Sequence, residues 1–168
     1  AAALISLGLA SCAPRDVPPG PASADRLPQV IPPHQGVPAP QSYMAVACSI
    51  DVLMIRSAEL AQTRARSAAL RAFASKLSRD HFGISSQLSF AGRRLNQLPS
   101  GQLLDNHAQR LAALQASSNF DAAYRTEVRR TLTAAYEYHN RYAQKGDSPT
   151  LRPVARFAAG VIARYLDA

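Results

Sequence analysis

The 168-residue sequence has no tryptophan and few β-branched residues, and no segment alternates apolar with polar residues. Alternation is the pattern of a half-buried β-strand, so its absence argues against a sheet-based fold. Alanine and leucine predominate instead, and 47% of all residues are hydrophobic. Both are good helix formers, and the length suits one domain with a buried core. The composition therefore predicts an all-α domain.

The short motifs of many catalytic and metal-binding sites are also missing. The sequence has no Glu-x-x-His, His-x-x-His, His-Glu-x-x-His or Cys-x-x-Cys pattern, no glycine-rich phosphate loop and no Gly-x-Ser-x-Gly. Without an activated nucleophile or paired acids, hydrolysis and group transfer have no candidate catalytic residues. We therefore expect a protein that is not an enzyme.

Apolar residues recur at intervals of three and four through five segments, a spacing typical of helices that bury one face. The first two segments form a hairpin around residues 57–92, which we take as the centre of the fold. Three further apolar stripes follow, at residues 103–114, 118–145 and 151–165. Long helices joined by short turns predict an up-and-down antiparallel bundle of about five helices, with a fifth helix packed on the others.

Polar residues mark the expected ends of these helices. Ser67 is the expected N-cap of the second helix, and Ser148 that of the last one, where proline follows in the first turn. Ser118 and Asp121 have the serine and acid spacing of a helix start. Gly146 is expected to end the fourth helix.

The net charge is +8, and it belongs entirely to the predicted helical domain, because 17 of the 19 basic and 9 of the 11 acidic residues lie after residue 41. A basic domain suggests nucleic acid, an anionic membrane surface or an acidic partner. The basic residues are scattered singly or in pairs opposite the apolar stripes, as on a solvated face. The envelope location indicated by the amino-terminal residues argues against nucleic acid.

The amino-terminal residues look like the end of a secretion signal. Residues 1–11 contain an apolar run, AAALISLGLA, that is too short to span a bilayer as a helix. It ends in Leu9-Ala10-Ser11-Cys12, which resembles the bacterial lipoprotein box. We expect Cys12 to carry the lipid that anchors the protein on the periplasmic side of the bacterial cell envelope.

Only one other cysteine exists, Cys48, and we interpret it as a small buried residue in the first helix. A disulfide between Cys12 and Cys48 is possible only if Cys12 is not lipidated. Between the anchor and the helical domain, assigned to residues 42–168, lies a linker at residues 12–41 that holds nine of the twelve prolines. Such a composition predicts an extended arm, acting either as a tether or as a segment that lies on a partner.

Three histidines, His81, His107 and His139, fall on apolar stripes of three different helices. Inward-facing histidines and carboxylates can hold a metal in a helical bundle, so Glu59, His81 and His107 are the candidate ligands of a transition metal. The alternative is a structural role, in which Asp80, His81 and His139 are hydrogen-bonded polar residues of the core.

Several stretches resemble a known family in the expected order. RSAELA at residues 56–61, RAFA at 71–74, Asp80-His81 and FDAAY at 120–124 are similar to domain-of-unknown-function family 4142 over about residues 41–166. The resemblance implies a ferritin-like helical bundle, secreted or lipid-anchored, often noted in stress-related contexts and without an established activity. The family pattern commonly has two further histidines, where this chain has Leu132 and Tyr165.

That departure weakens the metal hypothesis and favours a fold kept for its surface. We expect a non-catalytic accessory or scaffold subunit of a larger membrane-bound periplasmic complex, for example the small subunit of a respiratory dehydrogenase. One alternative is a metal-binding envelope lipoprotein that uses the ligands given above. Another is a stress-related protein whose arginines associate with anionic lipid.

Overall fold

Five α-helices follow one another in the computed structural model, which describes residues 36–167. They are α1 (Pro40–Arg64), α2 (Ala68–Arg94), α3 (Asp105–Ala116), α4 (Phe120–Lys145) and α5 (Leu151–Leu166). That part of the chain contains no β-strand, and the prediction of an all-α bundle of five helices is confirmed. None of its helices is both long and apolar enough to cross a membrane.

The helices start and stop largely where local chemistry indicates. The Ser67 hydroxyl accepts the Leu70 N–H at 3.3 Å and so caps α2. Ser148 does the same for the Leu151 N–H at 3.3 Å, although the helix itself begins only at Leu151. Gly146 follows the last residue of α4, as predicted.

The predicted capping pair at the start of α4 is different in the structure. The residue before the helix, Asn119, makes no side-chain cap, and Asp121 does not cap α4 either. Its carboxylate instead accepts the N–H groups of Arg66 and Ser67, at 3.2 and 3.4 Å, in the turn between α1 and α2. The acid therefore links two connections that are far apart in the sequence.

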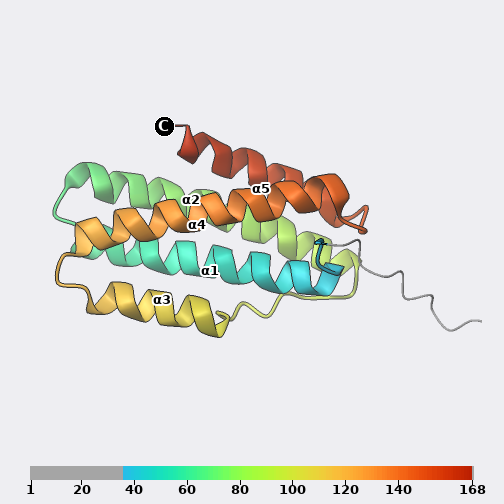
Figure 1. Cartoon of the computed structure of the whole chain (residues 1–168), viewed down its shortest axis with the longest axis horizontal. Coiled ribbons are helices and arrows are strands. Elements are labelled where there is room, and N and C mark those ends of the chain that lie inside the picture. Colours follow the sequence, from blue (N-terminus) through green and yellow to red (C-terminus); the bar gives the residue numbers. More distant parts are fainter. Residues whose placement is uncertain (1–35, 168) are drawn as a thin grey trace, which may run out of the picture. The chain divides into compact units, whose positions relative to one another are not determined.

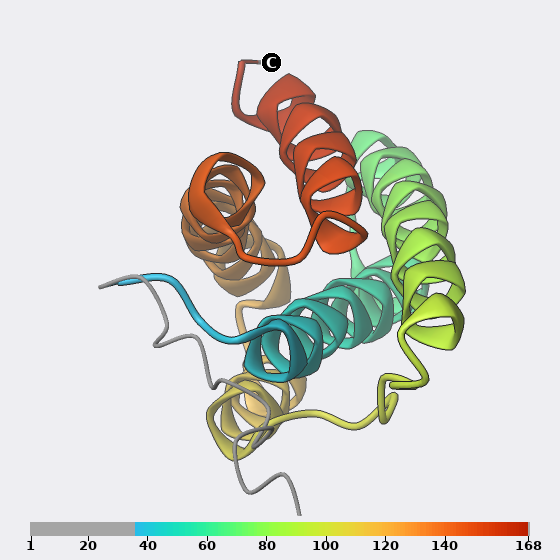
Figure 2. The ribbon, with the colours of Figure 1, turned by 90° about the vertical axis from the view of Figure 1, so that its right-hand side faces the viewer.

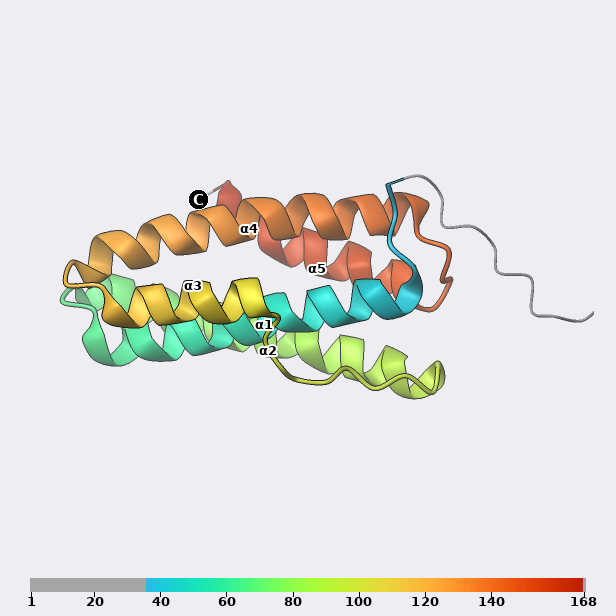
Figure 3. The ribbon, with the colours of Figure 1, turned by 60° about the horizontal axis from the view of Figure 1, so that its bottom comes forward.

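Four helices surround the main interior, and the fifth packs on their outer side and adds Leu111 and Leu114 to the core. Helix α1 contacts α2 and α4, and α5 contacts the same two helices from the opposite side, so α1, α2, α5 and α4 enclose a common interior (Figures 1 and 2). Helix α3 packs on α1 and α4 from outside this ring (Figure 3). The additional helix is thus α3, in the middle of the chain, and α5 completes the bundle.

A longer connection, residues 95–104, lets α3 reach that outer position. Gly92, near the end of α2, lies so close to the connection that a Cβ there would be 2.3 Å from the Gln97 carbonyl oxygen. Farther along, the Leu104 N–H donates to the Ser49 hydroxyl at 2.8 Å. This bond and a bond of 2.8 Å from the Gln97 N–H to the Gly92 carbonyl hold the connection against α1 and α2.

The predicted signal remnant at residues 1–11, Cys12 and most of the proline-rich arm at 12–41 lie outside the described residues. The end of the assigned arm does not: Val37 is buried in the core, and α1 already begins at Pro40. Proline is favourable in the first turn of a helix because the N–H it lacks would have no partner there. Pro40, assigned to the linker, is therefore a helix start.

Candidate functional site

A carboxylate and an imidazole form a buried hydrogen-bonded pair in the middle of the bundle. His81 on α2 and Asp51 on α1 are both 0% exposed, and the Nδ1–H of His81 donates to an Asp51 carboxylate oxygen at 2.7 Å. Burial raises the pKa of Asp51, and the bond from His81 partly offsets this effect. The pair links the two long helices of the central hairpin across 30 residues of sequence.

A second imidazole lies in the same interior, on α4. The Tyr43 hydroxyl and Nδ1 of His139 share a hydrogen bond of 2.8 Å, and both residues are 0% exposed. Burial, together with the nearby His81, lowers the pKa of His139 from 6.5 to about 3. His139 is therefore neutral near pH 7.

The ring of Tyr43 is also held by aromatic neighbours. It stacks on Tyr142 with ring centroids 3.7 Å apart and meets the His139 ring edge-on at 5.8 Å. Burial raises the pKa of Tyr43 well above its usual value, so the hydroxyl remains a donor. The interior thus combines a buried carboxylate–imidazole pair with a neutral, fully packed aromatic group.

One carboxylate oxygen and two imidazole nitrogens of this interior have no hydrogen-bond partner among the described residues. They are Oδ2 of Asp51, Nε2 of His81 and Nε2 of His139, and each is buried. Carboxylate oxygen and imidazole nitrogen are ligand types that transition metals accept. Nevertheless, within residues 36–167 no group of three His, Cys, Asp or Glu side chains is arranged to hold a metal ion.

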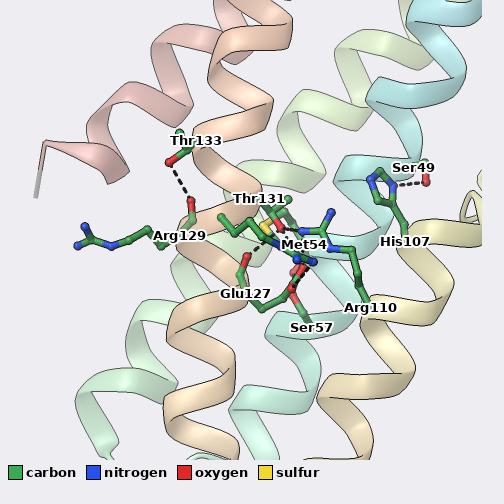
Figure 4. A network of polar contacts seen from close by, with 10 residues as sticks. Ser49, Met54, Ser57, His107, Arg110, Glu127, Arg129, Thr131 and Thr133 are labelled. Atoms are coloured by element: carbon green, nitrogen blue, oxygen red, sulfur yellow. Dashed lines mark hydrogen bonds and ion pairs between the residues drawn. The ribbon is translucent and has the colours of Figure 1, made fainter.

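A separate polar network joins α3 to the bundle. Arg110 on α3 forms an ion pair with Glu127 on α4 and donates to the Thr131 hydroxyl, which itself donates to the Glu127 carbonyl at 2.9 Å (Figure 4). On the same helix, His107 bonds through Nδ1 to the Ser49 hydroxyl at 2.7 Å. These contacts explain how a peripheral helix with only three buried residues stays attached.

Comparison with known families agrees with this architecture. Residues 28–168 match the family described as Domain of unknown function (DUF4142). The chain belongs to this family. Neither a curated protein nor a solved structure matches the chain. The match confirms the suspected resemblance, and the description of the DUF4142 family assigns no activity.

The structure does not bring the predicted metal ligands of this DUF4142 domain together. Glu59 is exposed on the outside of α1, His81 pairs with Asp51, and His107 bonds to Ser49 near α3. The three- and four-residue spacing places each of these residues on one face of its own helix. It does not specify which residues of another helix that face meets. The set is therefore not one site in this structure.

The predicted polar core also needs one correction. His81 and His139 lie in the interior, but Asp80 lies near the surface, where it bonds to Lys76 at 2.9 Å and to the Tyr165 hydroxyl at 2.7 Å. Asp80 and His81 are neighbours in a helix, so their side chains point about 100° apart. The partner of His81 is Asp51 instead.

Asp51 was missed, although the sequence contains a signal for it. Ala47, Asp51, Met54 and Ala58 follow one helical stripe, and all four are buried. A charged residue in register with such a stripe must find a partner inside the fold. Cys48 is a free, buried thiol whose pKa is raised by burial, which agrees with its interpretation as a core residue.

Proposed function

We propose that this DUF4142 protein is a non-catalytic accessory subunit of a larger periplasmic complex, held at the bacterial envelope by a lipid on Cys12. Its helical domain binds an acidic surface of the partner. The observation that carries the proposal is an arginine-lined groove on the outer side of α4 and α5. The groove has a volume of about 560 Å³, within the size range of binding clefts.

The groove offers positive charge and hydrogen-bond donors and no negative charge. None of the described residues that line it is acidic, and its polar lining is Tyr136, Asn140, Gln144, Arg152 and Arg156. Arg156 is exposed and forms no hydrogen bond or ion pair with other described residues. An unpaired guanidinium favours bidentate binding of a partner's carboxylate.

Small residues on α5 allow a close approach. Ala159, Gly160 and Ala163 line the groove beside the arginines, and a Cβ at Gly160 would meet nothing within 4 Å. A polypeptide could therefore lie against the helix without displacing a side chain. Arginine and tyrosine are also enriched in protein interfaces, where they often contribute much of the binding energy.

The interior supports a binding role better than a catalytic one. The ionisable groups that catalysis would need, Asp51, His81 and His139, are each 0% exposed, and a substrate has no contact with them. The charges that remain accessible are predominantly basic, in keeping with the net charge of +8. Such a surface accelerates association with an acidic partner and makes it sensitive to salt.

The test is native purification of the full chain from membranes solubilised in mild detergent, with the co-purifying proteins identified by peptide mass spectrometry. We expect a larger protein in a fixed ratio. Arg156→Glu should reduce its recovery about tenfold, the loss expected for an ion pair worth about 1.4 kcal/mol. Arg94→Glu, the same charge change at the exposed end of α2, is the matched control and should not.

Two results would reject the proposal. One is a protein that purifies alone in every detergent tested. The other is an equal loss of recovery in Arg156→Glu and Arg94→Glu, which would indicate only a general charge effect. Cys12→Ser checks the anchor separately: the chain should leave the membrane fraction and still bind its partner in solution. A chain that remains in the membrane would contradict the lipidation of Cys12.

Metal binding is the second candidate. The observation in its favour is that Oδ2 of Asp51 and Nε2 of His81 and His139 have no hydrogen-bond partner among the described residues, although these side chains are not grouped as a three-ligand site there. It predicts a stoichiometric transition metal in protein purified without chelator. His139→Leu should then lower the metal content. A metal content that is negligible, with His139→Leu changing only stability, would end this hypothesis.

A further inference from the structure

A second groove opens at the other end of α4, between that helix and the ends of α2 and α5. Its volume is about 470 Å³, which is within the range of small-molecule sites. The accessible lining is divided about evenly between polar and apolar surface, and its main hydrophobic side chains are Leu70, Phe73, Val128, Leu132 and Leu166. Leu166 is 38% exposed, so apolar surface remains accessible to solvent at this groove.

Positive charge lies along one wall of this groove. Arg125 and Arg129 are both on α4, one helical turn apart, and both are exposed. Neither guanidinium forms a hydrogen bond or ion pair with any other described residue. None of the described lining residues is acidic. The groove therefore combines apolar contact area with two unpaired cations on one side.

A buried hydroxyl provides an independent sign of a missing ligand. Tyr124 also lines the groove, is 0% exposed, and its hydroxyl has no hydrogen-bond partner among the described residues. Such a group is costly to bury without a partner. The neighbouring Tyr165 hydroxyl is not available to it, because that hydroxyl donates to Asp80 at 2.7 Å and accepts from Lys76 at 3.1 Å.

We propose that this groove binds a single-chain anionic amphiphile, a fatty-acid carboxylate of medium length. The hydrocarbon tail covers the apolar lining. The carboxylate accepts hydrogen bonds from the exposed Arg125 and Arg129, and entry of the ligand must displace the side chains that cover the Tyr124 hydroxyl before this hydroxyl can donate to it as well. A ligand with one anionic end and an otherwise apolar body satisfies both the cations and the hydrophobic wall, whereas a polar anion would leave the apolar surface uncovered.

The site is independent of the arginine-lined groove that carries the proposed function. That groove is formed by the opposite end of α4 and by α5, and the two share none of their lining residues. Variants in each groove can therefore test partner binding and amphiphile binding separately. Arg156→Glu should affect partner recovery and leave amphiphile binding unchanged, and variants of Arg125 and Arg129 should do the reverse.

The experiment is calorimetric titration of the full chain with octanoate, decanoate and laurate, each below its micelle concentration. We expect one binding site, with affinity rising about fourfold for each added methylene until the groove is filled. Acetate, which has the charge without the tail, and 1-decanol, which has the tail without the charge, should bind far more weakly than decanoate.

Variants then assign the contacts. The double variant Arg125→Gln/Arg129→Gln should weaken decanoate binding at least tenfold and remove most of its salt dependence. Tyr124→Phe should weaken it about threefold without changing that salt dependence. Ala69→Trp, at an exposed position of the lining, should fill the groove and abolish binding. Far-UV circular dichroism verifies that each variant is folded.

Several outcomes would overturn the proposal. They are an absence of decanoate binding, equal binding of decanoate and 1-decanol, and unchanged binding in Ala69→Trp. Binding to vesicles of phosphatidylcholine with and without phosphatidylglycerol shows whether the arginines bind a monomeric fatty acid or an anionic membrane surface. If the double arginine variant lowers binding to the anionic vesicles while monomeric decanoate does not bind at all, the arginines serve a membrane surface and the proposed site is rejected.

Discussion

The buried pair of Asp51 and His81 allows a demanding test, because both side chains are 0% exposed and no solvent screens them. His81→Leu removes the only hydrogen-bond partner that Asp51 has among the described residues. The carboxylate then stays buried without compensation. Breaking a buried pair in this way costs about 3–5 kcal/mol, a large part of the roughly 5–15 kcal/mol that stabilises a typical domain.

The double variant Asp51→Ala/His81→Leu should lose much less stability than His81→Leu. It removes both polar groups and keeps the summed side-chain volume close to that of the native pair, so no uncompensated charge remains. We expect it to be more stable than His81→Leu alone, because apolar replacement of a whole buried pair is often nearly neutral. Asp51→Ala alone should cost about 1–3 kcal/mol, since it leaves a neutral imidazole unpaired.

The assay is urea unfolding followed by circular dichroism at the helix band, repeated over a range of pH. In His81→Leu, burial raises the pKa of Asp51 above its ordinary value of 3.8 with no bond from His81 to offset it. The folded state then gains a proton before the unfolded state does. The deficit relative to wild type should shrink as the pH falls from 7 toward 4, by up to about 1.4 kcal/mol per pH unit.

Two results would refute this reasoning. One is a deficit for His81→Leu that is the same at pH 7 and near pH 4.5, because an uncompensated carboxylate must respond to pH. The other is a double variant whose loss equals the sum of the two single losses. That result would mean that Asp51 and His81 do not interact energetically, despite their 2.7 Å contact.

Three further predictions follow from other parts of the fold. The pKa of His139 is 6.5 in the unfolded chain and about 3 in the folded protein. The free energy of unfolding should therefore decrease as the pH falls between these values, by about 5 kcal/mol in total. His139→Gln should flatten this part of the stability–pH profile. Ser49→Ala leaves His107 and a backbone N–H of the α2–α3 connection unpaired and should lower the free energy of unfolding by about 1–3 kcal/mol in urea titrations. A loss of amide protection at the ends of α3 in hydrogen exchange would agree with this prediction, and unchanged stability would contradict it. Gly92→Ala should destabilise by about 1–3 kcal/mol because its Cβ would be 2.3 Å from a carbonyl oxygen, whereas Gly83→Ala in the same helix, with nothing within 4 Å, should stabilise by about 0.5–1 kcal/mol; thermal melts that rank the two variants in the reverse order would contradict the packing around the end of α2.

The helices were predictable because their information is local. A three- and four-residue spacing of apolar side chains requires only neighbours in the sequence to be read, and the Ser67 cap is a contact over three residues. The same locality explains the errors. Pro40 was assigned to the linker by its proline-rich neighbourhood, although a proline in the first turn is also a good helix start.

The candidate site was only half predictable, because a helical stripe tells which residues are buried but not which residues of other helices they meet. His81 and His139 were singled out correctly as positions on an apolar face, and both are fully buried. Their partners, Asp51 and Tyr43, come from α1 and lie 30 and 96 residues away. Nothing in the spacing along one helix specifies such a match.

By itself, then, the sequence determined the number of helices, most of their ends, the basic character of the domain and its membership of the DUF4142 family, since these depend on local pattern and composition. Only the tertiary structure decided that α3 is the outer helix, that Asp51 rather than Asp80 holds His81, and that Arg125 and Arg129 flank an apolar groove. Each of these depends on the rotation of one helix about its axis relative to another. That rotation is set by the packing of all the core side chains together, which no single segment encodes.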